Sequence, residues 1–174
     1  MANPVNLLIP DLICKEVYDV PFSRFWEEGV RVVVFDIDNT LVSYETPKPT
    51  QKVKELLSHL SGEGFSVALV SNNSPERVEL FNAELGYFAV ADSHKPLKRA
   101  LKPVFARFSV SSKQLLLVGD QLLTDVLAAR LHGARAVTVL PIKKKENLFF
   151  RFKRFLEKPF IRIYYRRKRK EEKK

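Results

Sequence analysis

The sequence predicts an α/β protein, a Rossmann-like three-layer sandwich with helices on both faces of a mainly parallel five-stranded sheet. Two observations lead to this fold class. Short apolar runs rich in β-branched residues alternate with longer segments of helical periodicity. The chain has 174 residues, 45% of them hydrophobic, which suits one compact domain with a core of its own.

Five apolar runs are the expected strands. The first, Arg31 to Phe35, reads Arg-Val-Val-Val-Phe and is typical of a strand buried on both faces. The others span 65–70, 115–118, 136–140 and, with a weaker pattern, 87–90. Between these strands we expect helices over 50–61, 75–85, 96–108 and 122–132. Alternating strands and helices imply a parallel sheet, in which ligands bind beyond the carboxyl ends of the strands.

Single residues refine these expectations. Ser74 and Pro75 resemble an N-cap and a first-turn proline, so a helix should begin there. Pro103 should kink or split the helix over 96–108, since proline lacks the amide proton that a helix interior requires. Trp26 is expected to pack an N-terminal helix against the sheet.

The net charge of +10 is concentrated at the C-terminus. Residues 143–174 hold 15 Lys and Arg against 4 Asp and Glu, whereas residues 1–142 are nearly neutral. We therefore predict a catalytic or binding domain over 1–142 and a basic amphipathic tail over 143–174. Such a tail favours a polyanion, either an anionic membrane surface or nucleic acid. The only cysteine, Cys14, excludes an internal disulfide framework. No apolar run approaches the roughly 18 residues of a membrane span, so a soluble or peripheral protein is expected.

Polar side chains follow the expected strands, as the parallel sheet requires. The candidates are Asp36, Asp38, Ser71, Asn72, Asp120 and Asp125, together with Lys95 at the expected start of a helix. Hydrolysis of a phosphate ester needs a nucleophile, a second acid that protonates the leaving group, and a cation with hard oxygen ligands such as Mg²⁺. It also needs a lysine and a hydroxyl that stabilise the transferring phosphoryl group. These segments supply one candidate for each task.

The motifs resemble those of the haloacid dehalogenase (HAD) superfamily. Asp36-Ile37-Asp38-Asn39-Thr40-Leu41 is similar to its first motif, Ser71 to the second, Lys95 to the third and the segment from Gly119 to Asp125 to the fourth. More narrowly, residues 7–140 resemble the YqeG-type branch, which includes phosphatases of phosphatidylglycerophosphate. The resemblance implies that Asp36 attacks phosphorus and ligates Mg²⁺. It also implies that Asp38 is the general acid and base and offers its backbone carbonyl to the metal.

The remaining roles come from the same resemblance. Asp120 is expected to ligate the metal, and Asp125 to support it, either through water or by holding Lys95. Ser71 and Asn72 are expected to bind phosphoryl oxygens, while Lys95 bridges Asp36 and the phosphate. The gaps between motifs are too short for the cap domain of many relatives, so we expect an open site. An open site favours phosphate on something large, such as a lipid head group at a membrane.

Two interpretations of the tail stay open. The apolar residues Leu148, Phe149, Phe152, Phe155 and Leu156 fall on one face of a helix that Pro159 should stop or kink. That helix could pack on the sheet, or lie in an anionic lipid surface with a polybasic segment behind it. The favoured hypothesis is a Mg²⁺-dependent phosphatase of a membrane lipid, peripherally attached inside the cytoplasm or an organelle. The alternatives are a HAD-fold binding protein for RNA or the ribosome, and a phosphatase of soluble phosphates or phosphoproteins.

Overall fold

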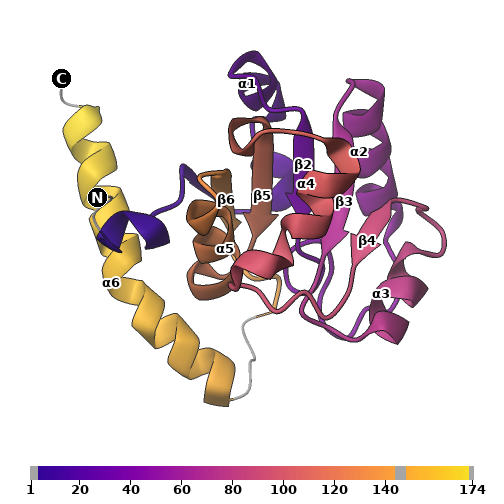
Figure 1. Cartoon of the computed structure of the whole chain (residues 1–174). Coiled ribbons are helices and arrows are strands. Elements are labelled where there is room, and N and C mark those ends of the chain that lie inside the picture. The colour runs from indigo at the N-terminus through magenta and orange to yellow at the C-terminus, as the bar shows by residue number, and fades with distance from the viewer. Residues whose placement is uncertain (1–3, 144–147, 173–174) are drawn as a thin grey trace.

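Six parallel strands form a single sheet in the computed structural model, which describes residues 4–143 and 148–172, except the side chains of 4 and 148–150 (Figure 1). The strands are β1 (Leu12–Cys14), β2 (Val32–Phe35), β3 (Ser66–Val70), β4 (Phe88–Val90), β5 (Leu115–Gly119) and β6 (Arg135–Val139). Their order across the sheet is β1-β6-β5-β2-β3-β4, and every neighbouring pair is parallel. The α/β class and the five expected strands are therefore confirmed.

The sixth strand, β1, was not expected from the sequence. It is only three residues long, too short to show a period of two, and it lies at the edge of the sheet beside β6. Asp11 fixes its register, because its backbone amide donates to the carbonyl of Ala136 and its carboxylate accepts from the amide of the same residue. The strand is thus defined by a long-range contact and not by its own pattern.

Helices cover both faces of the sheet, which gives the predicted three layers. On one face lie α1 (Phe22–Glu27), α2 (Gln51–Gly62) and α3 (Pro75–Asn82). The opposite face carries α4 (Lys102–Phe108) and α5 (Leu127–Leu131), and α6 (Leu148–Glu171) lies to the side of α5 (Figure 1). No helix within the described residues is long and apolar enough to cross a membrane.

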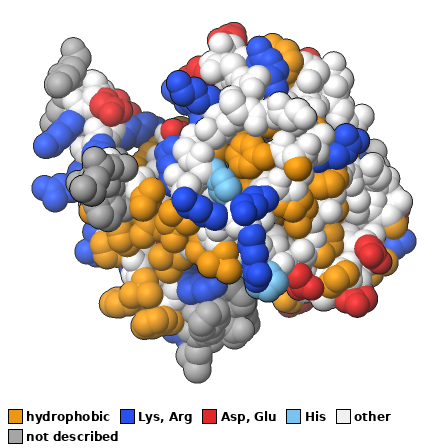
Figure 2. Space-filling model, viewed as in Figure 1, with side chains coloured by type: hydrophobic (Ala, Val, Ile, Leu, Met, Phe, Trp, Pro, Cys, Tyr) orange, Lys and Arg blue, Asp and Glu red, His pale blue; other side chains and the backbone are white. Residues whose placement is uncertain are grey.

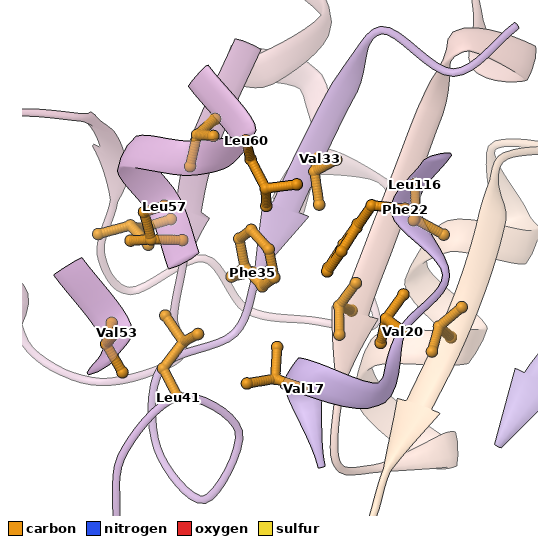
Figure 3. Packing of buried hydrophobic residues seen from close by; sticks show 14 of the residues in the cluster. Val17, Val20, Phe22, Val33, Phe35, Leu41, Val53, Leu57, Leu60 and Leu116 are labelled. Atoms are coloured by element: carbon orange, nitrogen blue, oxygen red, sulfur yellow. The ribbon is translucent and has the colours of Figure 1, made fainter. Parts of the chain in front are cut away.

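The two hydrophobic cores explain why β2 reads as a continuous apolar run. Val33 and Phe35 point into the core beneath α1 and α2, whereas Val32 and Val34 point into the core beneath α4 and α5. Leu57 of α2 lies close to Phe35 in Figure 3. Burying side chains of this size stabilises the fold by about 1.5–3 kcal/mol each, so the central strand is held rigidly. Trp26 packs α1 as predicted, because its ring meets Phe65 edge-on at 4.9 Å.

The predicted third helix is split, as Pro103 indicated. A 3₁₀ turn covers Lys98–Ala100, and α4 begins only at Lys102, so that Pro103 lies in its first turn. Lys95 therefore does not open a helix. It lies in the loop after β4, followed by a cis peptide bond to Pro96. The expectation that Lys95 begins a helix was wrong, because the proline at 103 moved the helix start towards the C-terminus.

The C-terminal helix α6 runs through Pro159 instead of ending there. Pro159 and Phe155 are both exposed, so water can solvate the carbonyl that loses its helical hydrogen bond. One face of α6 docks on the domain: Phe160 and Ile161 pack against the core beneath α5, and Tyr164 is buried. The Tyr164 hydroxyl accepts a 3.2 Å hydrogen bond from the amide of Ile13 in β1. The predicted contributions of Leu148 and Phe149 to its apolar face lie outside the described side chains.

The strand order reverses between β2 and β5. From β2 the chain proceeds through β3 to β4 on one side, and then returns to place β5 and β6 on the other. Loops that leave two such strands diverge and leave a crevice at the carboxyl edge of the sheet. Asp36 follows β2 and Asp120 follows β5, so both lie at this crevice.

Candidate active site

A small pocket of about 160 Å³ lies at this crevice. Five of the seven residues predicted from sequence line it: Asp36, Asp38, Ser71, Asn72 and Lys95. The other lining residues are Tyr44, Asn73, Gln121, Thr124 and Lys153. Asp120 and Asp125 are almost completely buried and contribute from behind the lining. Segments separated by more than a hundred positions along the chain therefore meet in one place.

Asp36 is held by two donors. Its carboxylate accepts a 2.7 Å hydrogen bond from the Lys95 ammonium and a 3.1 Å hydrogen bond from the Thr40 hydroxyl. Burial raises the pKa of Asp36 to about 6, against the opposing attraction of Lys95. Its backbone amide continues the sheet by donating to the carbonyl of Val118 in β5. The carboxylate is thus fixed at the end of the rigid central strand, facing the pocket.

Lys95 links the two strands that flank the crevice. Its ammonium lies 2.7 Å from Asp36 and 2.7 Å from Asp125, and donates to the carbonyl of Val70 at 2.6 Å. Burial alone would lower the pKa of Lys95, but the carboxylates of Asp125 and Asp36 outweigh it and raise the pKa, so the side chain stays charged. The contact with Asp125 matches one of the two supporting roles expected of that residue.

Asn72 holds the backbone of Lys95 in place. The side-chain oxygen of Asn72 accepts a hydrogen bond from the backbone amide of Lys95 at 2.7 Å. The side-chain amide of Asn72 donates to the backbone carbonyl of Lys95 at 2.9 Å. Asn72 therefore has a structural role, holding the Lys95 backbone, that the sequence did not predict. Its contact with phosphate stays a prediction. Ser71 is buried at the edge of the pocket, and its hydroxyl accepts a 3.0 Å hydrogen bond from the Asn73 amide.

Asp38 lies past the strand end, where the chain turns back. Asn39 has a φ of 64°, and its amide donates to the carbonyl of Val42 at 2.7 Å. This reversal brings Asp38 to the same pocket as Asp36, although residues two apart on a regular strand would point to opposite faces. Arg77 donates to one carboxylate oxygen of Asp38 at 2.9 Å, and Asn73 donates to the other at 3.1 Å.

Asp120 is bound by the C-terminal helix. The Arg154 guanidinium contacts both the backbone carbonyl and one carboxylate oxygen of Asp120. The other carboxylate oxygen is buried without a hydrogen-bond partner among the described residues. Burial raises the pKa of Asp120 to about 8, with Arg154 opposing this and Asp36 and Asp125 adding to it. The carboxylate is therefore only half satisfied.

Gly119 provides the space for Asp125 behind the pocket. A Cβ atom at Gly119 would lie 2.3 Å from the side-chain carboxyl carbon of Asp125, closer than any real contact. Asp125 accepts from the Gln121 amide at 3.1 Å and from the Thr124 hydroxyl at 3.3 Å, which fixes the loop that follows β5. Glycine is thus required at this position by a close approach and not by a turn.

The residues present fit a magnesium ion chemically. Asp36, the Asp38 backbone and Asp120 offer only oxygen donors, which Mg²⁺ prefers, and Mg²⁺ ordinarily completes its shell with water. The unpartnered oxygen of Asp120 is a buried acceptor that a cation would satisfy. Within residues 4–143 and 148–172, no three His, Cys, Asp or Glu side chains form a ready-made cage.

Sequence reasoning assigned no role to several residues that the structure places in or beside the site, among them Arg77, Asn73, Lys153 and Arg154. Asn73 follows Ser71 and Asn72 directly, and its position after a strand was a usable signal. Arg77 lies two residues into α3, where an arginine is most often solvated. Lys153 and Arg154 belong to the tail that the charge pattern separated from the domain. Only the docking of α6 shows that they reach the site.

The fold and the pocket together define the HAD class of hydrolases. The family model described as HAD-hydrolase-like matches residues 93–146. A probable phosphatase, YqeG of Bacillus subtilis, is 31% identical to this chain, over 90% of this chain and 91% of the YqeG chain. The chain belongs to the HAD superfamily, in its YqeG branch of phosphatases.

Further comparisons agree with this placement. A chloroplastic phosphatidylglycerophosphate phosphatase of Chlamydomonas reinhardtii is 27% identical over 79% of this chain, which spans about half of that longer protein, 54%. The solved structure of a HAD hydrolase, YfnB of Bacillus subtilis bound to magnesium, superposes with a TM-score of 0.53 at 16% identity. That superposition covers 69% of this chain and 91% of the other. At this identity, the superposition shows the shared fold alone.

Proposed function

We propose that this phosphatase is a Mg²⁺-dependent phosphomonoester hydrolase that works through an aspartyl-phosphate on Asp36. The observation that carries the proposal is the pair of 2.7 Å contacts that Lys95 makes with Asp36 and Asp125 inside the pocket. A buried ammonium beside a carboxylate nucleophile can attract phosphate without blocking the carboxylate. Asp38 shares the pocket, where Arg77 and Asn73 hold its carboxylate, and it is the candidate for proton transfer.

In the first half of the reaction, a carboxylate oxygen of Asp36 attacks phosphorus and the bond to the ester oxygen breaks. Asp38, in its protonated form, gives its proton to the departing alkoxide. Lys95 and the Ser71 hydroxyl stabilise charge on the phosphoryl oxygens. The products of this half are the free alcohol and phosphorylated Asp36.

In the second half, Asp38 removes a proton from water and the resulting hydroxide attacks phosphorus. The bond between phosphorus and Asp36 breaks, which releases inorganic phosphate and restores both aspartates. Asp36, the Asp38 carbonyl and Asp120 would hold Mg²⁺, which when bound neutralises the phosphate and favours the ionised form of Asp36. Arg77 and Asn73 keep the Asp38 carboxylate directed into the pocket.

We propose a lipid phosphomonoester as the substrate, with phosphatidylglycerophosphate as the favoured case. Two observations support this class. Relatives of this chain are named as phosphatases of that lipid. A larger hollow of about 550 Å³ lies beside the catalytic pocket, and Val17, Leu41, Val42, Leu140 and Ile142 make much of its lining apolar.

The two hollows share one loop. Tyr44 lines the catalytic pocket, whereas Ser43 and Thr46 line the apolar one. Thr40 also lines the apolar pocket while donating to Asp36. A substrate that carries a hydrophobic group next to its phosphate could therefore bind with the phosphate in the catalytic pocket and the hydrophobic group in the apolar one. Leu140 and Ile142 are each more than half exposed at the rim of the apolar pocket.

The outward face of α6 supports attachment to an anionic membrane. Phe152 and Phe155 are 59% and 63% exposed, and Leu156 is 41% exposed. Basic residues with exposed side chains lie along the same helix: Arg151, Lys158, Arg162 and Arg166. Figure 2 shows hydrophobic side chains gathered over the lower half of α6, with Lys and Arg nearby. Apolar side chains flanked by basic ones suit the interface of an anionic bilayer.

A phosphate-release screen tests the proposal. Phosphatidylglycerophosphate in anionic liposomes would be compared with soluble phosphomonoesters, each with Mg²⁺ and with a chelator. We expect Mg²⁺-dependent release that favours the lipid and a loss of at least a thousandfold in Asp36→Asn, since the amide cannot act as the nucleophile. Full activity in that variant would overturn the mechanism, and preference for a soluble ester would overturn the lipid assignment alone.

The matched control is Asp19→Asn, which makes the same chemical change at an exposed position outside the catalytic pocket. Its activity and thermal midpoint should stay close to those of the unmodified protein. Circular dichroism and thermal unfolding of Asp36→Asn should match as well, because an amide has nearly the same volume as the carboxylate. A folded but inactive Asp36→Asn beside an active Asp19→Asn would separate chemistry from folding.

A further inference from the structure

Arg154 connects the C-terminal helix to the buried carboxylates of the site. It contacts Asp120 at two points, the carboxylate and the backbone carbonyl, and its guanidinium is mostly buried. The same helix turn places Glu157 in the domain, where its carboxylate accepts a 3.0 Å hydrogen bond from the Leu123 amide. Positions 154, 157, 161 and 164 recur with helical spacing and form the inner face of α6. The contact with Asp120 is therefore part of how the helix docks.

Asp120 has capacity for one further partner. Its side chain is completely buried, one oxygen faces Arg154, and the other has no hydrogen-bond partner among the described residues. A buried carboxylate oxygen without a partner is costly, since it has lost its hydration and gained nothing. A cation at this oxygen would offset that cost.

The charges of the buried residues indicate what that ligand does to Arg154. Asp120 faces the Arg154 guanidinium, and a second buried carboxylate, Glu157, lies 3.4 Å from the same guanidinium. Arg154 therefore keeps an anionic partner in Glu157 when a dication takes its place at Asp120. Two cations on one buried carboxylate repel each other strongly, because the surroundings screen them poorly.

We propose that Arg154 and the divalent cation are alternative partners of Asp120, so that Arg154 is a positioning residue that holds the cation-free site together and leaves Asp120 when the site loads. The inference rests on the magnesium dependence proposed above. It deepens that proposal by making the C-terminal helix, and not only the 1–142 domain, part of the metal equilibrium. The site would then bind the cation most readily when α6 moves away from the domain.

Calorimetric titration with Mg²⁺ alone, without substrate, tests the exclusion on the full chain. Arg154→Met should bind Mg²⁺ more tightly by about tenfold or more, because a charged hydrogen-bonded competitor has been removed. Arg154→Lys keeps a cation in reach of Asp120 and should restore affinity towards that of the unmodified protein. Arg162→Met makes the same charge change on an exposed part of α6 and should leave affinity unchanged. Equal or weaker binding by Arg154→Met would overturn the proposal.

A second measurement uses the unmodified chain and does not depend on how a variant folds. Phenylglyoxal modifies accessible arginines, and mass spectrometry can follow Arg154 with Arg162 as an internal reference. Saturating Mg²⁺ should raise the rate at which Arg154 is modified and leave that of Arg162 unchanged. A rate at Arg154 that stays constant or falls would show that the cation and the guanidinium share Asp120, and the proposal would be wrong.

The outcomes separate this inference from the proposed function. If Mg²⁺ binds and Arg154 responds, but no phosphomonoester is hydrolysed, the exclusion stands and the function fails. If esters are hydrolysed while neither the unmodified protein nor Arg154→Met binds Mg²⁺ measurably, the function needs another cation and the exclusion is overturned.

Discussion

The Arg77 guanidinium lies 2.9 Å from a carboxylate oxygen of Asp38, although 39 positions separate the two residues. The same guanidinium donates to the carbonyl oxygens of Thr46 and Pro47. Arg77 therefore joins α3 to the loop that carries the proposed general acid. Both side chains of the pair are largely buried, at 14% and 11% exposure, so water competes little for either.

Arg77→Met should reduce turnover by roughly ten- to a hundredfold, because small misplacements of a reacting group have costs of that size. Initial rates over a range of ester concentrations would separate turnover from KM, and only turnover should change markedly. Arg77→Lys should recover part of the activity, since a lysine can reach Asp38 but cannot bind both loop carbonyls as well. Arg99→Met, at an exposed arginine, is the control. Normal turnover in Arg77→Met would show that Asp38 needs no such support.

Gly119→Ala should destabilise the protein by about 1–3 kcal/mol, as overpacking of a well-filled site does. The added methyl group would lie 2.3 Å from the Asp125 carboxyl carbon, and Asp125 cannot yield without releasing Lys95. Activity should fall together with stability. Urea unfolding would measure the stability, and phosphate release would measure the activity.

Gly62→Ala is the matched control, because a Cβ at Gly62 meets nothing within 4 Å. Gly62 is the last residue of α2, so alanine there should be neutral or slightly stabilising. If Gly119→Ala were as stable and active as Gly62→Ala, Asp125 would have to occupy a different place from the one described.

How far the sequence could predict this site depends on what each residue reports locally. Asp36 and Asp38 follow a strand that is apolar on both faces, and this position alone marks the edge of a parallel sheet. Lys95 was identified from its place at the expected start of a helix and from its resemblance to a motif, although the helix itself starts later. The contact between Lys95 and Asp125 then joins two of the predicted segments.

Other features carried no local signal. β1 has three residues and exists because Asp11 and β6 hold it. Arg154 and Glu157 belong to the predicted basic tail, whose helix was expected either to pack on the sheet or to lie in a lipid surface, and an isolated amphipathic helix does not show which of its polar residues turn inward. Their roles depend on the docking of α6, which is a long-range event. Sequence patterns report periodicity and strand ends well, and pairings between distant segments poorly.

Replacing the exposed aromatic residues of α6 should weaken membrane binding. Phe152→Ser with Phe155→Ser is expected to reduce affinity for anionic vesicles by about tenfold or more, because burying one such ring contributes about 1.5–3 kcal/mol. Co-sedimentation with phosphatidylglycerol-containing vesicles would measure it. Binding of the unmodified protein should also weaken with salt. The control is Leu80→Ser with Leu97→Ser, two exposed leucines outside α6. Equal vesicle binding by both double variants would exclude this face as the contact.

The apolar pocket predicts a dependence on chain length that does not require a membrane. Phosphate release from monomeric short-chain lipid phosphomonoesters, kept below their critical micelle concentration, should become more efficient as the chain lengthens. Leu140→Asp with Ile142→Asp should remove this gain, because the rim would become charged. Leu97→Asp, at a similarly exposed leucine outside this pocket, should retain it. Efficiency that is independent of chain length in the unmodified protein would show that the pocket does not receive the substrate.

The stability of the docked α6 should depend on pH through Glu157. Burial raises the pKa of Glu157 above its ordinary value near 4.5, although the Leu123 amide and Arg154 oppose the shift. A raised pKa in the folded state means that the contribution of Glu157 to stability is complete below its unfolded-state pKa. The contribution is then lost as pH rises through the folded-state pKa. Glu157→Gln keeps an acceptor for the Leu123 amide but does not titrate.

The thermal midpoint of the unmodified protein relative to that of Glu157→Gln should therefore fall as pH rises from about 4 towards 7. Differential scanning calorimetry in a chelating buffer would measure both midpoints without a bound cation. Glu79→Gln, at an exposed glutamate of α3, should show no pH-dependent difference of this kind. A difference that is constant across the range would mean that Glu157 is equally ionised in the folded and unfolded chains. In that case its ion pair with Arg154 would compensate fully for its burial, and pH would not act on the docking of α6 through this residue.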